Sequence, residues 1–191
     1  MAGCIIPLAV AGWVFAPQLL SGWLGRQDDT IVMVFRWLLL GVSCTGLMWL
    51  PAALQQASGW TRLHASMIAG SVVVGVPLTY LAIRAYGTVG ATTVWVLNGI
   101  AGLTIELWLM HRRLLVGQLM AWYRSVVAPP LLVTLPIVAI SWWLLPGHPS
   151  RWTGLTWGAL TGLLAVGMSL LIVLGGIHRA RRPALDQTLT N

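Results

Sequence analysis

The stretch from Pro77 to Leu115 contains the end of one long apolar segment, a tight turn and the whole of a second apolar segment. The first segment ends at Arg84, the turn falls at residues 86–88 (Tyr-Gly-Thr), and the second segment closes on the basic cluster His111-Arg112-Arg113. Long apolar runs with unequal charge at their far ends are typical of a transmembrane helical hairpin. A hairpin of this kind restricts the chain to folds in which helices cross a lipid bilayer.

The rest of the chain has the same apolar character. Charged residues make up 8% of the 191 residues and hydrophobic residues 58%, with a mean hydropathy of +0.83. A soluble globular domain carries about 25% charged residues, so this chain cannot cover a water-facing surface. We therefore predict an all-α, polytopic membrane protein surrounded by membrane lipids.

Six apolar runs are long enough to cross the membrane. Each has about 19 to 26 residues, and a helix rising 1.5 Å per residue needs about 20 residues to cross a hydrocarbon core of ~30 Å. An even number of spans places both chain termini on the same side of the membrane. The predicted bundle covers residues 1–177, with spans at 1–24, 31–54, 65–83, 89–110, 126–145 and 152–177, and a basic tail that we expect to be disordered follows at 178–191.

The arginines indicate which side is cytoplasmic. The formal net charge is +7 and every Lys or Arg position is arginine. These residues lie at the ends of the apolar runs rather than along one face, which argues against a nucleic-acid partner. The positive-inside rule makes the richer side cytoplasmic, together with both termini. The richer side carries Arg62, Arg112, Arg113, Arg124, Arg179, Arg181 and Arg182, and the poorer side carries Arg26, Arg84 and Arg151.

The sequence contains no recognisable catalytic arrangement. No Ser/His/Asp set in a polar context, phosphate-binding loop or metal-ligand spacing occurs. Three of the four acidic residues, Asp28, Asp29 and Asp186, lie in connections or in the tail. Cys4 and Cys44 lie in apolar runs without CxxC spacing, so we interpret both as small core residues. We expect no enzymatic activity, no cofactor and no metal.

Glu106 is an acidic residue within a predicted span, and charges inside a membrane are functional candidates. It lies four residues before Met110, near the cytoplasmic end of its span, and level with Arg62 and His64 at the same end of the neighbouring span. Two interpretations remain open. Glu106 forms a structural ion pair there, with Arg62 as the candidate partner, or it couples proton movement to transport.

Arg36 is the basic residue within a span. Its nearest acidic groups are Asp28 and Asp29, toward which the side chain can extend. The alternative is that Arg36 faces a wet cavity and binds an anionic headgroup. Gln55 and Asn98 either line a cavity or form hydrogen bonds between helices. Arg36, Gln55 and Asn98 are therefore the candidate substrate-binding residues.

Glycines at every fourth position of the last span predict a close helix contact. Gly154, Gly158 and Gly162 give the small-xxx-small pattern, which lets two helix backbones approach each other. Packing within one bundle and packing between two copies of the chain are both compatible with this pattern.

Several segments resemble the second half of Wzx-type polysaccharide flippases, which belong to the multidrug/oligosaccharidyl-lipid/polysaccharide exporter superfamily. The YG-x-x-GA pattern at Tyr86 is shared across that superfamily, whereas the LQQASGWT and MHRRLL signatures favour its oligosaccharide branch. The resemblance covers essentially the whole chain. The matching segments are FAPQLLSGWLG (15–25), PAALQQASGWTRL (51–63), VPLTYLAIRAYGTVGATTVWVLN (76–98) and MHRRLLVGQLMAWY (110–123).

The resemblance implies a MATE-like fold with two helical bundles around a central cavity. It further implies a protein of the bacterial inner membrane that moves polyprenyl-pyrophosphate-linked oligosaccharide between leaflets for surface polysaccharide or O-antigen synthesis. Such flippases have twelve or more helices, so we expect this chain to be a C-terminal portion that requires the missing N-terminal helices. Two alternatives stay open: a cation-coupled multidrug exporter of the same superfamily, for which Glu106 is the acidic candidate, and a truncated membrane protein that transports nothing.

Overall fold

Helices make up all the regular secondary structure that a computed structural model of the chain describes, over residues 1–26, 28–147 and 149–189, with side chains described as far as Gly175. The elements in chain order are α1 (Ala2–Val14), α2 (Ala16–Leu24), α3 (Asp29–Ala57), α4 (Thr61–Ala101), the π-helix η1 (Gly102–Glu106), α5 (Leu107–Arg113), α6 (Leu119–Trp122), the π-helix η2 (Tyr123–Val127), α7 (Ala128–Trp143) and α8 (Arg151–Leu189).

Four helical segments within the described residues are long and apolar enough to cross a membrane. They are α3, the continuous run Thr61–Arg113, the continuous run Leu119–Trp143, and Arg151–Gly175 of α8. The pair α1 and α2, bent by 76° at Phe15, gives a fifth if it is counted as one broken span. The prediction of an all-α protein with several helices long and apolar enough to cross a membrane is therefore confirmed.

The run Thr61–Arg113 is folded back on itself at Gly87. This glycine has φ +61° and ψ −141°, a conformation that residues with a side chain rarely adopt. The chain reverses there into a first limb (residues 61–86) and a second limb (residues 88–113). The limbs pack so closely that a Cβ atom on Gly90 would collide with the carbonyl of Ala82. The turn predicted at residues 86–88 is thus present.

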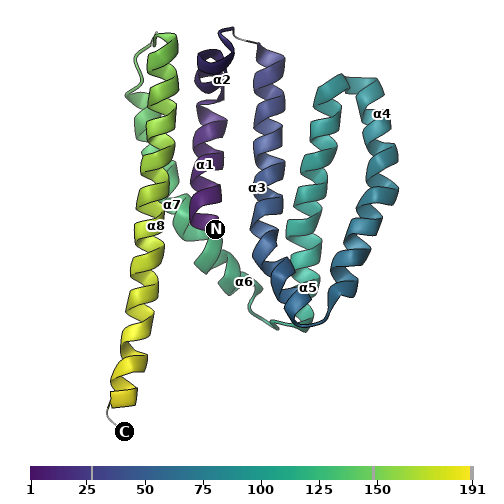
Figure 1. Ribbon diagram of the computed structural model, residues 1–191, viewed down its shortest axis with the longest axis vertical. Coiled ribbons are helices and arrows are strands. Elements are labelled where there is room, and N and C mark those ends of the chain that lie inside the picture. Colours follow the sequence, from purple (N-terminus) through teal and green to yellow (C-terminus); the bar gives the residue numbers. More distant parts are fainter. Residues whose placement is uncertain (27, 148, 190–191) are drawn as a thin grey trace.

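The helices lie in a curved row from α8 to the first limb (Figure 1). α1, α7 and α8 pack against one another, α3 packs on α1, and the second limb packs on α3. The first limb lies at the edge of the row. Every buried residue of α4 belongs to the second limb, whereas valines of the first limb such as Val73 are largely exposed. One face of the hairpin is therefore covered by no helix of the described chain.

The glycines of α8 pack within the bundle, the first of the two predicted alternatives. A Cβ atom on Gly158 would come within 3.0 Å of Phe15, and one on Gly162 would come within 3.7 Å of Ala11. Phe15 is fully buried at the bend between α1 and α2, where it packs with Ala11 and Val138. The small residues of α8 therefore make room for the broken span.

Helix α8 continues to Leu189, beyond the predicted end of the sixth span at residue 177. The backbone of the tail at 178–189, which we expected to be disordered, is therefore helical. Alanine, arginine and leucine favour helices, and they recur in this segment, so the helix extends past the apolar run that predicted its length. The side chains of this segment lie outside the described residues.

Candidate functional site

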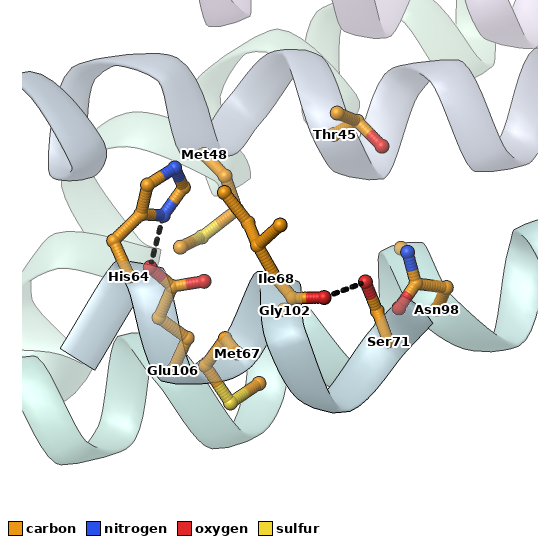
Figure 2. A pocket seen from close by; sticks show the side chains of 10 residues that line it. Thr45, Met48, His64, Met67, Ile68, Ser71, Asn98, Gly102 and Glu106 are labelled. Atoms are coloured by element: carbon orange, nitrogen blue, oxygen red, sulfur yellow. Dashed lines mark hydrogen bonds and ion pairs between the residues drawn. The ribbon is translucent and has the colours of Figure 1, made fainter. Parts of the chain in front are cut away.

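A cavity of about 160 Å³ lies between α3 and the two limbs of the hairpin (Figure 2). α3 contributes two of its lining residues, and each limb contributes four. One end of the cavity holds Glu106 and His64, and the other end holds the small polar side chains (Figure 2). The lining residues are Thr45, Met48, His64, Met67, Ile68, Ser71, Asn98, Gly99, Gly102 and Glu106.

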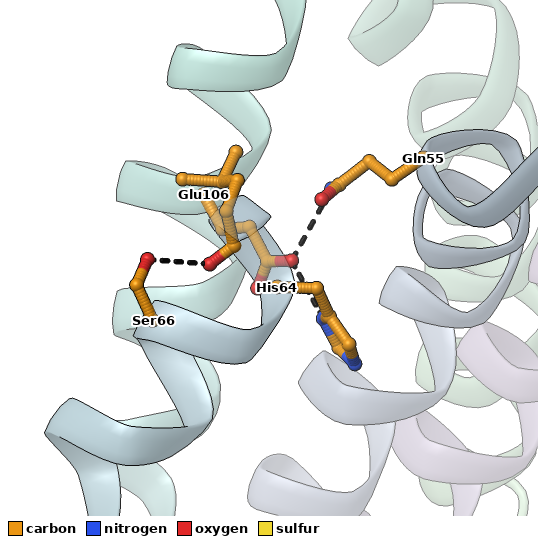
Figure 3. Close-up of polar contacts among 5 residues, drawn as sticks. Gln55, His64, Ser66 and Glu106 are labelled. Carbon is orange, nitrogen blue, oxygen red and sulfur yellow. Dashed lines mark hydrogen bonds and ion pairs between the residues drawn. The ribbon is translucent and has the colours of Figure 1, made fainter. Parts of the chain in front are cut away.

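Glu106 is the buried acid of this cavity, with 5% of its surface exposed. One carboxylate oxygen, Oε1, lies 2.8 Å from Nδ1 of His64 on the first limb and accepts a hydrogen bond from Nε2 of Gln55 on α3 at 3.2 Å (Figure 3). The three residues come from three helical segments. Their contact therefore ties the base of the hairpin to α3.

His64 takes the place that the sequence suggested for Arg62. Helical residues two positions apart lie about 200° apart around the axis. His64 consequently faces the second limb, while Arg62 points away and is exposed. Glu106 therefore contacts His64 rather than Arg62 at this end of the span, and the contact is an ion pair when the imidazole is protonated.

Gln55 is fully buried and bonds to another helix, as the second of its two interpretations requires. Its amide oxygen Oε1 has no hydrogen-bond partner among the described residues. A buried acceptor without a donor is unfavourable by about 1–3 kcal/mol. This oxygen belongs to the amide group that contacts Glu106, so the region around the carboxylate contains an acceptor that has no donor among the described residues.

The π-helix η1 sets the orientation of Glu106 at its last position. Single-turn π-helices are rare and occur often at functional sites. The hydroxyl of Tyr123, at the start of the second π-helix, donates to the carbonyl of Leu103 at 3.0 Å. The chain therefore folds back after α5, so that the first residue of η2 supports the widened turn. Neither π-helix nor the role of Tyr123 follows from the sequence pattern.

Asn98 lines the cavity from the second limb, about two helical turns from Glu106. Its side chain is exposed, and it also lines a neighbouring groove of about 510 Å³ together with Ser71 and Thr79 of the first limb. The cavity and the groove share Asn98 and Ser71 and therefore adjoin along the hairpin, although most of the residues that line the groove are apolar. Two of the predicted site residues, Gln55 and Asn98, are thus brought to one region with Glu106.

Arg36 lies elsewhere and forms a contact that the sequence analysis did not consider. Pro17 has no N–H, so it cannot bond to the carbonyl of Trp13 four residues earlier. Nε of Arg36 donates to this carbonyl at 2.9 Å, and the guanidinium lies 6.0 Å from the Trp13 ring. Arg36 therefore bonds to the backbone at the bend, and no ion pair with Asp28 or Asp29, the first of its two interpretations, forms among the described residues. It does not belong to the Glu106 cavity.

Arg151 donates hydrogen bonds to backbone carbonyls at the end of α2, as Arg36 does at the end of α1. Its Nε donates to the carbonyl of Gly22 at 2.7 Å, and Nη2 reaches the carbonyl of Trp23 at 3.4 Å. Both carbonyls belong to the last turn of a helix, where they lack partners within the helix. A cation at a helix C-terminus is also favoured by the helix dipole. Two arginines from other helices thus hold both halves of the broken span.

The carboxylate and the imidazole of the cavity can accept hydrogen bonds and exchange protons. Among the residues that the structure describes, no group of three or more His, Cys, Asp or Glu is placed to hold a metal ion. Comparison with known proteins yields no relative: no family model matches the chain, and no match is found among curated proteins or among solved structures.

Proposed function

We propose that the chain is a helical bundle of a transporter in the bacterial inner membrane, and that it crosses the membrane six times. Counting the bent pair as one crossing and the two limbs of the hairpin separately gives this number. The connections at Gly25, Gly87 and Gly147 then face the periplasm. Both termini and the arginine-rich connection after α5 face the cytoplasm.

The observation that carries the proposal is the buried Glu106–His64 pair at a cavity inside the hairpin. A charged side chain within a membrane is expensive, and it typically faces a bundle interior or a water-filled cavity used by substrate or ions. A purely structural helix contact does not need a carboxylate, since apolar packing at such a site is often more stable than an ion pair. A role of Glu106 in transport would account for the free-energy cost of burying its carboxylate.

The substrate class is inferred from the sequence resemblance. We infer that the transported molecule is a polyprenyl-pyrophosphate-linked oligosaccharide used for surface polysaccharide synthesis. The side chains of Asn98 and Ser71 offer hydrogen-bonding groups in an otherwise mostly apolar groove, beside a hairpin edge that no helix of the described chain covers. A second bundle, supplied by further helices of the same transporter, would close this edge into a MATE-like cavity.

A cation-coupled multidrug exporter is the second candidate, favoured by the same carboxylate at the cavity. The two candidates differ in cargo, so one experiment separates them. The gene for this chain is deleted in its own bacterium. The fraction of lipid-linked oligosaccharide in the outer leaflet is then measured on spheroplasts with an impermeant glycan-oxidising reagent, and ethidium efflux is measured in parallel.

We expect the outer-leaflet fraction to fall on deletion and to return with the wild-type gene, while ethidium efflux is unchanged. Complementation with Glu106→Gln should restore it poorly. Ser66→Ala, a change close to the pair in sequence but on the exposed face, should restore it fully. Loss of ethidium efflux with normal glycolipid distribution would favour the exporter. No change in either measurement would contradict a transport function.

A further inference from the structure

A second cavity, of about 430 Å³, lies beside the bend between α1 and α2 and shares no residue with the Glu106 cavity. It is bounded by Trp13 and Pro17 on one side and by one face of α3 on the other. α3 contributes Asp29, Arg36 and Trp37, along with the apolar residues Val32 and Met33. Two charges of opposite sign and two tryptophans thus face one space.

Both charged groups have polar atoms that form no hydrogen bond to a described residue. Arg36 uses its Nε for the Trp13 carbonyl, which fixes the guanidinium at the cavity and leaves its terminal nitrogens without a bond to any described residue. The neighbouring Asp28 is occupied as the cap of α3, where it accepts from the N–H groups of Thr30 and Ile31. Asp29 has no such role, and within the described part of the chain no ion pair joins it to Arg36.

The two charges are spaced along the membrane normal. Seven residues separate them, so their Cα atoms lie about 10 Å apart on the same face of α3. Helical side chains lean toward the N-terminus of the helix, so the long side chain of Arg36 extends toward Asp29. The guanidinium therefore lies closer to Asp29 than the Cα atom of Arg36 does. The guanidinium of Arg36 and the carboxylate of Asp29 can therefore contact two neighbouring groups of one bound molecule.

The depth of the cavity matches the layer of lipid headgroups. α3 has 29 residues, hence a length of about 44 Å, which exceeds the hydrocarbon core of ~30 Å by several ångströms at each end. Asp29, at the helix start, therefore lies among the headgroups, and Arg36 lies near the boundary of the hydrocarbon. Trp13 and Trp37 are of the residue type that is enriched at this interface.

We propose that this cavity binds the headgroup of a phosphoethanolamine lipid from the outer leaflet of the membrane. Arg36 donates hydrogen bonds to the lipid phosphate, and Asp29 accepts from the ammonium group. A choline headgroup has no N–H to donate to Asp29, and an anionic glycerol headgroup offers it no positive charge. The pairing of opposite charges therefore selects ethanolamine over both, and the site is independent of what the protein transports.

The test is native mass spectrometry of the purified full chain, released from nanodiscs that contain equal amounts of dioleoyl phosphatidylethanolamine, phosphatidylcholine and phosphatidylglycerol. We expect the ethanolamine lipid to be retained about two- to fivefold over the other two, the range for an ion pair at a partly exposed site. Asp29→Asn should abolish the preference over phosphatidylglycerol while leaving the fold intact, because this side chain is exposed and outside the cap. Arg36→Gln should lower retention of all three lipids.

Arg84→Gln is the matched control, since it removes an exposed arginine that stacks on Tyr80 away from the cavity. Its lipid preference should equal that of the wild type. Equal retention of the three lipids by the wild type, a preference for phosphatidylglycerol, or an unchanged preference in Asp29→Asn would each overturn the proposal.

Discussion

Replacing His64 with alanine tests whether the buried carboxylate of Glu106 depends on its imidazole partner. Glu106 is 5% exposed, and its Oε1 lies 2.8 Å from Nδ1 of His64. Removing one partner of a fully buried pair costs about 3–5 kcal/mol. The His64 side chain is 32% exposed, so water replaces part of the lost contact, and we expect His64→Ala to lower the free energy of unfolding by about 2–3 kcal/mol.

The same replacement in a Glu106→Gln background isolates the charge. The amide oxygen that this background places at the carboxylate position accepts only neutral hydrogen bonds, each worth about 0.5–1.5 kcal/mol. His64→Ala should then cost about 1 kcal/mol, which leaves a coupling energy of about 1–2 kcal/mol between the two positions. We expect the single variant Glu106→Gln itself to be tolerated, because no charge remains buried.

The measurement is unfolding of the purified protein in mixed dodecyl maltoside and SDS micelles, followed by tryptophan fluorescence. Ser66→Ala is the control, since this exposed side chain bonds only to the carbonyl of Leu63 among the described groups. The control should change stability by less than about 0.5 kcal/mol. An equal cost of His64→Ala in both backgrounds would refute the ion pair as the reason for the contact.

Three further changes test the bend and the hairpin in the same assay. Arg36→Gln should cost less in a Pro17→Ala background by about 1 kcal/mol, because alanine restores the N–H that bonds to the Trp13 carbonyl; additive costs would contradict this role. Gly90→Ala should destabilise by about 1–3 kcal/mol through its clash with the opposite limb, whereas Gly70→Ala, which meets open space, should not. Gly87→Ala should cost about 1–3 kcal/mol from backbone strain at positive φ, and an unchanged stability would show that the turn is not required.

Apolar run length predicts most of the helices, because lipid leaves the backbone few alternatives to internal hydrogen bonds. The Tyr-Gly-Thr turn at residues 86–88 is found where a glycine must reverse the chain. The helices extend beyond the apolar runs, as α3 does from Asp29 to Ala57. Run length reports how much of a helix lies in lipid, whereas capping and helix propensity determine where the helix ends.

The candidate site could be predicted only in part. Depth along the span places Glu106 beside the turn that carries both Arg62 and His64, but the choice between them depends on helix rotation, which only the packed structure fixes. The role of Arg36 depends on the free carbonyl of Trp13. The sequence position of Pro17 predicts that this carbonyl has no partner within its own helix. The group that donates to it comes from another helix and could not be predicted.

The most direct test of the membrane arrangement is the accessibility of the two ends of the second limb from either side of the membrane. Tyr86→Cys and Val116→Cys place thiols at exposed positions in the connections at those ends, in a background where Cys4 and Cys44 are replaced by alanine. An impermeant maleimide on intact spheroplasts should label position 86 and should label position 116 only after permeabilisation. Labelling of both positions from outside would show that the second limb does not cross the membrane, and labelling of position 116 alone would show that the bundle is inverted.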